Sequence, residues 1–276
     1  MSNEYLHLLR DFELQQVLGS LPSPQDEGTG PRVLDIGAGT GRQAALLKAR
    51  GYAVVAVDLA SSAYAAERVF PVIEYDGVHI PLDDASVNVV FSSNVLEHVE
   101  HLDALLAETR RILMEGGLAV HILPTPSWRI WTSLAHFPWL ISRSFSLVFG
   151  GPISSAQGKV SAGSGAVGRG AGKLKRLAAS LWPARHGERG NAFTEVRYFS
   201  ERWWRKAFVD CGFNVVETRP AGLFYTGAML LAGRLSLGMR RRLATFLGSS
   251  CRIYILSAAP PEGGLPDSHG PGDQTY

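Results

Sequence analysis

Residues 31–42 read PRVLDIGAGTGR, and this stretch decides the fold. Val33–Ile36 has the character of a short buried strand, and residues 43–50 have the spacing of an amphipathic helix. The glycines between them are Gly37, Gly39 and Gly41. Glycine has no Cβ, so it allows a positive φ and lets a ligand lie against the backbone. A strand, a glycine-rich turn and a helix in this order are typical of an α/β sheet that binds a nucleotide-like ligand.

The spacing of the glycines discriminates between ligands. The dinucleotide pattern G-x-G-x-x-G needs a glycine at position 42, where this chain has Arg42. The acid Asp35 stands before the first glycine, and a carboxylate there repels a pyrophosphate but suits an amino-acid ammonium group. A nicotinamide-dependent, NAD(P)-binding oxidoreductase is therefore the less favoured enzyme class. A tight turn without any ligand is the other alternative.

Acidic residues also follow the next two predicted strands. Asp58 ends the apolar run 52–57, at the position of a ribose ligand in many nucleotide sites. Its carboxylate can accept hydrogen bonds from both ribose hydroxyls, although a plain turn residue at a strand end is the alternative. Asp76 and Gly77 follow a short strand predicted at 72–75.

A fourth strand, predicted at 87–91, is followed by Asn94 and by VLEHV at 95–99. With D-x-G-x-G-x-G, Asp58 and Asp76, this order resembles the class I S-adenosylmethionine-dependent methyltransferases, specifically the type 11, ubiquinone-biosynthesis-like group that acts on small molecules. The resemblance implies S-adenosyl-L-methionine as cofactor. The residues that it implies for cofactor binding are Asp35, Gly37, Ala38, Gly39, Gly41, Asp58, Leu59, Asp76, Gly77 and Asn94.

The same resemblance implies an α/β fold: a Rossmann-like, doubly wound sheet of seven strands, the last one antiparallel, with a helical insert after strand five. The predicted domains are a capping helix and loop at 1–31, a methyltransferase domain at 32–258 and a disordered tail at 259–276, with 124–198 as a helical, flexible substrate lid inside the domain. The remaining helices are predicted at 5–18, 61–70, 101–113, 200–212 and 223–247, and the remaining strands at 118–123, 213–217 and 252–257.

The predicted insert, residues 124–198, shows the weakest resemblance to the family. Its segment 128–149 is apolar and aromatic and has about the length that spans a bilayer. Arg129, His136, Pro138 and Arg143 interrupt it, so lid or interfacial helices are predicted instead of a transmembrane span. A glycine-rich, mobile stretch is predicted at 158–172 and a short basic helix at 173–181.

The net charge is only +2, but acids prevail in residues 1–150 and bases in 151–252. The basic half suits an anionic substrate, a membrane surface or plain solvation, and its amphipathic segment 223–247 leaves peripheral membrane contact open. A small or lipid-like substrate is expected, and no nucleic acid, because no N-P-P-Y-like run is present. Cys211 and Cys251 lie far apart and are expected to be buried thiols. The first residues show no signal-peptide pattern, so a cytoplasmic location is expected.

Methyl transfer is an in-line displacement, and an oxygen acceptor needs a base within hydrogen-bond reach. His98, after the fourth strand, and His186, in the insert beside two arginines, are the candidate catalytic residues. Glu97 and His98 are open to a catalytic or metal-assisting role, or to one in orienting the loop. No metal site is expected, because His186 and Glu195 have no recognised ligand spacing. We therefore expect O-methylation of a small or amphipathic molecule, with a non-catalytic scaffold at a membrane surface as the alternative.

Overall fold

The computed structural model describes residues 3–24, 30–149, 185–227 and 234–259. Within them the strands form one sheet in the order β3-β2-β1-β4-β5-β7-β6. Their bounds are β1 Arg32–Ile36, β2 Ala53–Leu59, β3 Ile73–Tyr75, β4 Val87–Ser93, β5 Leu113–Pro124, β6 Phe213–Pro220 and β7 Cys251–Ala258. β1 to β5 are mutually parallel, while β7 runs antiparallel to both β5 and β6. The predicted seven-stranded, Rossmann-like sheet with its last strand antiparallel is confirmed.

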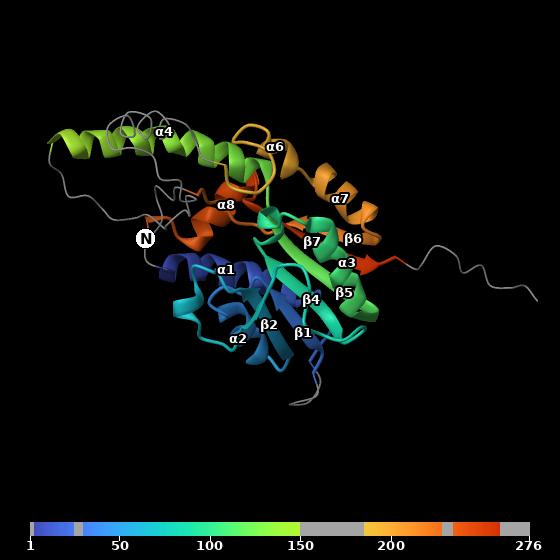
Figure 1. Cartoon of the computed structure of the whole chain (residues 1–276). Helices are drawn as coiled ribbons and strands as arrows, with labels where there is room; N and C mark the ends of the chain where they lie inside the picture. Colours follow the sequence, from blue (N-terminus) through green and yellow to red (C-terminus); the bar gives the residue numbers. More distant parts are fainter. Residues whose placement is uncertain (1–2, 25–29, 150–184, 228–233, 260–276) are drawn as a thin grey trace, which may run out of the picture.

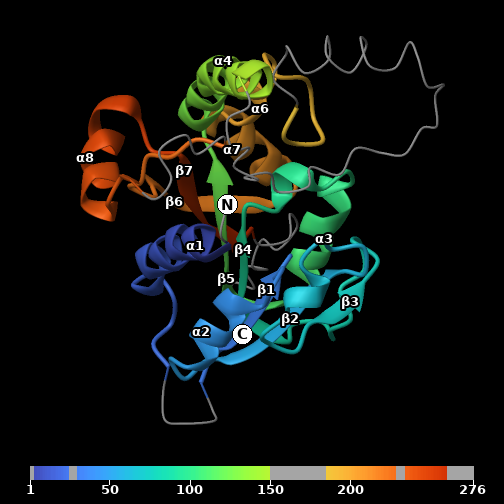
Figure 2. The ribbon, with the colours of Figure 1, turned by 90° about the vertical axis from the view of Figure 1, so that its left-hand side faces the viewer.

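Helices cover both faces of this sheet (Figures 1 and 2). Their bounds are α1 Asn3–Leu18, α2 Arg42–Lys48, α3 Leu102–Ile112, α4 Pro126–Phe149, α6 Glu195–Tyr198, α7 Glu201–Asp210 and α8 Leu237–Leu247. Side chains alternate along each strand, so Val33 packs in the core under α1 and α2, and Leu34 in the core under α3 and α7. This alternation makes the sheet doubly wound, as predicted.

Two helix predictions are wrong. Residues 61–70 form only a short 3₁₀ turn, Ala65–Glu67. The backbone amide of Val69 donates to the carbonyl of Thr40 at 2.8 Å, so this segment follows the glycine turn. Pro71 also disfavours a helical conformation for the residue before it.

The second wrong prediction is the continuous helix at 223–247, because among its described residues only α8 is α-helical and residues 223–226 are not. Ser236 begins α8 by accepting a hydrogen bond from the amide of Met239. Upstream of it, Leu223 and Tyr225 lie in no helix and hydrogen-bond to Ser250, so the chain there runs beside the start of β7. Residues 228–233 lie outside the described part of the chain.

The insert begins with α4, a single helix of 24 residues that directly follows β5 (Figure 1). None of the helices in the described part of the chain combines the length and apolarity needed to cross a bilayer. The predicted glycine-rich stretch at 158–172, the basic helix at 173–181 and the tail from residue 260 lie outside the described residues. The domain bounds and the lid stay predictions.

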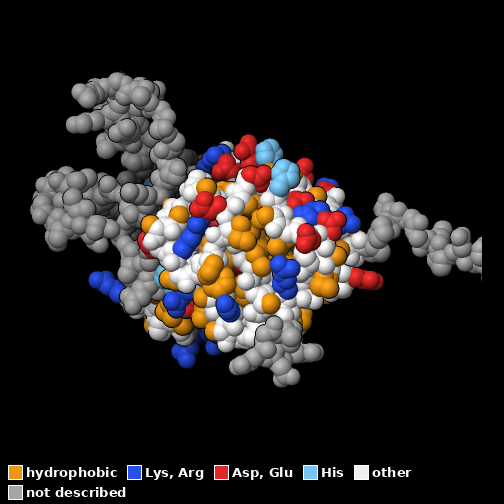
Figure 3. All heavy atoms as spheres, turned by 60° about the horizontal axis from the view of Figure 1, so that its bottom comes forward, with side chains coloured by type: hydrophobic (Ala, Val, Ile, Leu, Met, Phe, Trp, Pro, Cys, Tyr) orange, Lys and Arg blue, Asp and Glu red, His pale blue; other side chains and the backbone are white. Residues whose placement is uncertain are grey.

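On the face that Figure 3 shows, hydrophobic, basic and acidic side chains are interspersed. The uneven charge of the sequence therefore does not produce a continuous basic surface on this face.

A buried ion pair anchors the end of the insert to its first helix. Arg129 of α4 and Glu195 of α6 approach to 2.9 Å, with side chains 2% and 0% exposed. The Arg129 Nε also donates to the carbonyl of Ala192 at 3.1 Å. An ion pair this deeply buried costs much desolvation, and removing one partner leaves the other charge stranded.

We expect Glu195→Ala to lower the free energy of unfolding by about 3–5 kcal/mol, because Arg129 would stay buried without its counter-charge. Urea denaturation followed by circular dichroism measures this. Asp210→Ala, which breaks the exposed pair with Lys206, is the control and should cost less than about 0.5 kcal/mol. Equal losses in the two variants would contradict the structural role of the buried pair.

Candidate active site

The glycine-rich turn leaves β1 with all three glycines at positive φ: 68° at Gly37, 57° at Gly39 and 75° at Gly41. The amides of Gly37 and Ala38 donate to the carbonyl of Val57, at 2.9 and 3.1 Å, which ties the turn to β2. A Cβ on Gly37 would lie 2.5 Å from Val95 Cγ2, so no larger residue fits there. The turn therefore keeps bare backbone against the end of β4.

Asp35 does not line the cavity at this turn, although the sequence predicts a contact with the cofactor. Its side chain is 2% exposed and points toward α2, where the backbone amide of Ala44 hydrogen-bonds to it. Gly41, the N-cap of α2, has no side chain to cap the helix, so Asp35 supplies the acceptor from across the turn. Burial, reinforced by the charge of Asp58, raises the pKa of Asp35 to about 8.

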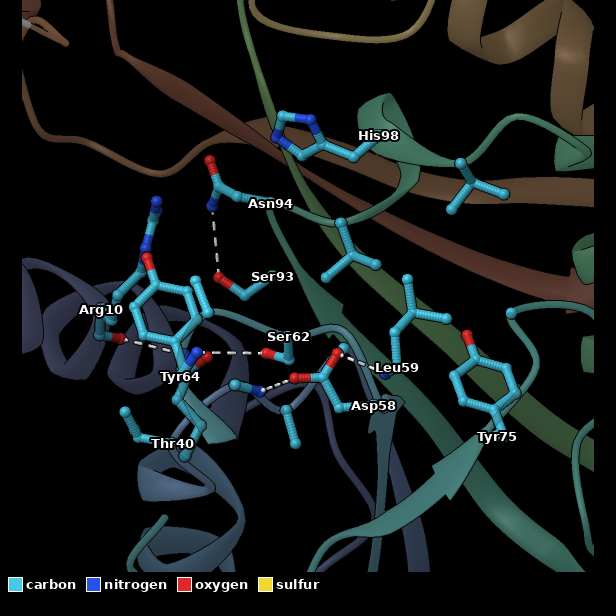
Figure 4. Close-up of a pocket in the computed structure, with 18 of the residues that line it drawn as sticks. Arg10, Thr40, Asp58, Leu59, Ser62, Tyr64, Tyr75, Ser93, Asn94 and His98 are labelled. Carbon is cyan, nitrogen blue, oxygen red and sulfur yellow. Dashed lines mark hydrogen bonds between the residues drawn. The ribbon is translucent and has the colours of Figure 1, made fainter. Parts of the chain in front are cut away.

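Asp58 ends β2 and joins it to the turn. Its Oδ2 accepts a hydrogen bond from the Gly39 amide at 3.0 Å, and its Oδ1 accepts one from the Leu59 amide at 2.8 Å (Figure 4). The carboxylate lies at the wall of the cavity and is mostly buried. A carboxylate oxygen has two lone pairs, so both oxygens keep acceptor capacity for a ligand.

The cavity has a volume of about 730 Å³, within the range of small-molecule sites. The residues that the sequence predicts and that line it are Gly37, Ala38, Gly39, Asp58, Leu59, Asp76, Gly77, Asn94 and His98. Gly41 shapes the turn from behind, where a Cβ would lie 2.7 Å from Phe70 Cβ. The carboxyl ends of β1, β2 and β4 thus meet at one cavity, as expected for an α/β sheet.

Asp76 lies at the exposed rim of the cavity. Its Oδ1 accepts the amides of Val78 and His79 at 2.8 and 2.7 Å, and its Oδ2 lies 2.7 Å from His79 Nδ1. The bond to the His79 ring, followed by those two amides, lowers the pKa of Asp76 to about 2. This carboxylate therefore stays ionised at neutral pH, and its predicted contact with the cofactor stays a prediction.

The chain leaves β4 through Asn94, which has a positive φ of 56°. The Asn94 amide donates to the carbonyl of Ile122 at 2.8 Å, and the 3₁₀ turn Leu96–His98 follows. His98 lines the cavity at this end, and burial lowers the pKa of its imidazole. The ring is therefore neutral at pH 7 and has a nitrogen that can accept a proton or bind a cation.

His186 does not line the cavity but lies against His98, with ring centroids 4.7 Å apart. Burial, followed by the nearby His98, lowers the pKa of His186 to about 3. The two candidate catalytic histidines thus come together from β4's end and from the insert. His121, by contrast, is fully buried in β5 and hydrogen-bonds Ser92 at 2.8 Å, as expected of a core residue.

The first helix contributes more to this site than the sequence indicates. Arg10 of α1 lines the cavity, and its Nη1 lies 2.6 Å from Glu13 and 3.2 Å from the Tyr225 hydroxyl. Tyr225 in turn donates to Glu13 at 2.7 Å and lies 3.0 Å from Cys251 Sγ. The sequence predicts α1 only as a cap, because Arg10 belongs to no motif and its partners come from the far end of the chain.

A bare glycine turn at the carboxyl edge of a β3-β2-β1-β4-β5-β7-β6 sheet, with an acid at the end of β2, defines the fold of the class I S-adenosylmethionine-dependent methyltransferases. Residues 34–121 match the family described as a methyltransferase domain. The chain therefore contains a methyltransferase domain of this class, and the resemblance seen in the sequence is confirmed.

Curated relatives match the same region. The chain is 34% identical over 93 residues to malonyl-[acyl-carrier protein] O-methyltransferase of Serratia marcescens, an alignment covering 32% of this chain and 36% of that protein. It is 30% identical over 137 residues to demethylmenaquinone methyltransferase of Thermobifida fusca, covering 44% and 58%. The matched part thus spans about a third of the length of the first relative and somewhat more than half of the second, in both cases less than two thirds.

Among solved structures, the chain is similar to the complex between a Haloferax volcanii methyltransferase and its Trm112 activator, with a TM-score of 0.53 at 15% identity. The superposition covers 92% of this chain and 91% of that one. At this identity the similarity establishes the fold.

The position of Asp35 predicts a pH-dependent stability. Its folded pKa of about 8 lies above the ordinary 3.8, so the protonated form favours the folded state. That contribution is complete below about pH 4 and is lost as the pH rises through about 8. Asp35→Asn keeps an acceptor for the Ala44 amide but cannot ionise.

We therefore expect the melting temperature of Asp35→Asn, relative to the wild type, to rise between about pH 5 and pH 8 and then to level off. Differential scanning fluorimetry across this range measures the difference in melting temperature between the variant and the wild type. A difference in melting temperature that is constant with pH would show that Asp35 titrates at its ordinary pKa.

Proposed function

We propose that this chain transfers a methyl group from S-adenosyl-L-methionine to an oxygen atom of a small or amphipathic molecule. The observation that carries the proposal is that the Gly37–Gly39 turn, Asp58 and His98 all line the same cavity. These features supply bare backbone, a hydrogen-bond-accepting carboxylate and a neutral imidazole, and Figure 4 shows Asp58 and His98 among the residues that line the cavity.

The residues present fit this cofactor. The positive-φ glycines leave room for a ligand on the backbone, and Asp58 keeps lone pairs for the hydroxyls of a ribose. Leu59 and Tyr75 offer apolar surface on the cavity wall for a purine ring. Bound there, the cofactor would supply a methyl group activated by its positive sulfonium, and the protein would align it and exclude water.

Two observations support an amphipathic acceptor with an oxygen nucleophile. One relative is named a malonyl-[acyl-carrier protein] O-methyltransferase, which supports an oxygen acceptor, and another is named a demethylmenaquinone methyltransferase, which supports an apolar acceptor body. In this chain, α4 exposes Ile130, Leu134 and Phe137 at helical spacing, which provides apolar surface on the insert.

Peripheral membrane contact fits the same proposal. Helix α8 exposes Met239 and Phe246, the latter to 86%, next to the exposed Arg241 and Arg242. Apolar side chains beside cations are the pattern that binds an anionic bilayer surface. A cytoplasmic location stays a prediction.

Binding of S-adenosylhomocysteine tests the cofactor assignment. We expect Asp58→Ala to weaken it by about 10- to 100-fold, because charge-assisted hydrogen bonds to carboxylates contribute roughly 1.5–3 kcal/mol. Isothermal titration calorimetry measures the dissociation constant. The control is Glu74→Ala, one residue before the end of β3, whose carboxylate pairs with Arg68 and does not line the cavity. Tighter binding of NAD(P) than of S-adenosylhomocysteine by the wild type would overturn the proposal.

Methyl transfer itself is tested with tritium-labelled cofactor and acceptors that carry a malonyl thioester or a hydroxyquinone. We expect His98→Ala to lower kcat by about 100-fold or more while leaving the KM for the cofactor within a few-fold, because His98 lines the cavity and in this proposal acts on the acceptor. The release of S-adenosylhomocysteine gives an independent readout. An unchanged kcat in His98→Ala would remove this residue from the reaction.

A further inference from the structure

Three potential metal ligands converge beside the cavity: Glu97, His98 and His186. Glu97 Oε1 lies 3.7 Å from His98 Nε2 and 4.0 Å from His186 Nε2. The ligand atoms of the three side chains all lie within 4.8 Å of one another. Two come from the turn after β4 and one from the insert, so the grouping is created by the fold.

The carboxylate of Glu97 lacks the partners that a buried acid needs. Its side chain is 0% exposed, and among the described residues no donor hydrogen-bonds to Oε1 or Oε2. Buried polar atoms in folded proteins are almost always paired, because stranding one costs about 1–3 kcal/mol and more for a charge. This carboxylate therefore points to a cationic ligand between it and the two imidazoles.

The insert holds His186 in place. Glu195 Oε1 accepts the amides of His186 and Gly187, at 2.6 and 2.7 Å. The amide of Glu188 donates to the carbonyl of Glu97 at 2.9 Å. A Cβ on Gly187 would lie 2.7 Å from that same carbonyl oxygen, so only glycine allows this approach. The hydrogen bond from Glu188 and the buried carboxylate of Glu195 thus hold the insert close to Glu97.

We propose that Glu97, His98 and His186 bind a divalent transition-metal ion of the Zn²⁺ class. Two imidazole nitrogens and one carboxylate oxygen form a three-ligand set that leaves at least one coordination position open. Ligand bonds of about 2.0–2.2 Å place tetrahedral ligands about 3.4 Å apart. The two distances from Glu97 Oε1, 3.7 and 4.0 Å, are close to this value, and the two imidazoles, within 4.8 Å of each other, need to approach by up to about 1.4 Å. The histidine side chains are 42% and 36% exposed and have room to move.

The surroundings suit such a site. Trp128 packs on His186 with ring centroids 4.5 Å apart and restricts the orientation of the imidazole. Burial raises the pKa of the Glu97 carboxyl to about 8, and Arg10, which favours its charged form, is itself paired with Glu13 at 2.6 Å. A metal ion bound at Glu97 would take the place of the carboxyl proton.

The open coordination position belongs on the side of the cavity, because His98 lines it. An oxygen of the methyl acceptor bound there would be polarised by the ion, with His98 as a ligand instead of a base. This use of the ion rests on the proposed function, whereas binding of the ion does not.

The test uses the full-length chain, freed of metal with a chelator and titrated with Zn²⁺ against a chromophoric competitor. We expect one Zn²⁺ per chain and at least about 10-fold weaker binding in each of Glu97→Gln, His98→Ala and His186→Ala. Co²⁺ substitution should give visible d–d bands that these variants lose. The control is His79→Ala, which removes an exposed histidine beside the carboxylate of Asp76 and should bind Zn²⁺ as the wild type does.

Calorimetry with S-adenosylhomocysteine on the same variants shows that they are folded and separates the two proposals. Zn²⁺ binding that depends on the three side chains in a chain that fails to transfer methyl groups would support the metal site and refute the proposed function. Absence of Zn²⁺ binding by a wild type that binds S-adenosylhomocysteine would overturn the metal site, as would binding that none of the three substitutions weakens.

Discussion

The contact between the Gly37 turn and Val95 is the constraint on which the rest of this structure depends. Space for a side chain is lacking at Gly37, and the backbone there must take a positive φ, so β1 ends in bare peptide against the end of β4. The amide of Gly39 is then free to bond Asp58, which brings the end of β2 to the same place. One cavity forms because three strand ends are tied to a single turn.

A second set of contacts holds the insert beside His98 at that cavity. Arg129 and Glu195 bury opposite charges between α4 and α6, and Glu195 uses its other oxygen to hold the amides of His186 and Gly187. The cost of burying these charges is compensated only when all the partners are in place. These contacts hold the insert against the sheet domain next to His98, which lines the cavity. The stability of the protein and the geometry of the site therefore depend on the same residues.

The sequence predicted the sheet well and the helices less well, for a physical reason. Apolar runs and glycine spacing are local properties, and each strand buries the residues that its own pattern marks. Residues 61–70 have a helical pattern too, but Thr40 and Pro71 impose another path on them. Leu223 and Tyr225, in the predicted helix at 223–247, likewise bond to Ser250. In both cases a distant partner outweighed local propensity.

By itself, the sequence determined the class of fold, the glycine turn and Asp58 as a cavity carboxylate, because their geometry follows from neighbours along the chain. Only the tertiary structure decided that Asp35 caps α2 outside the cavity, that Arg10 enters it, and that His186 meets Glu97. These depend on where a side chain points after strands and helices have packed. Contacts between remote segments have no periodicity or spacing that a single sequence can display.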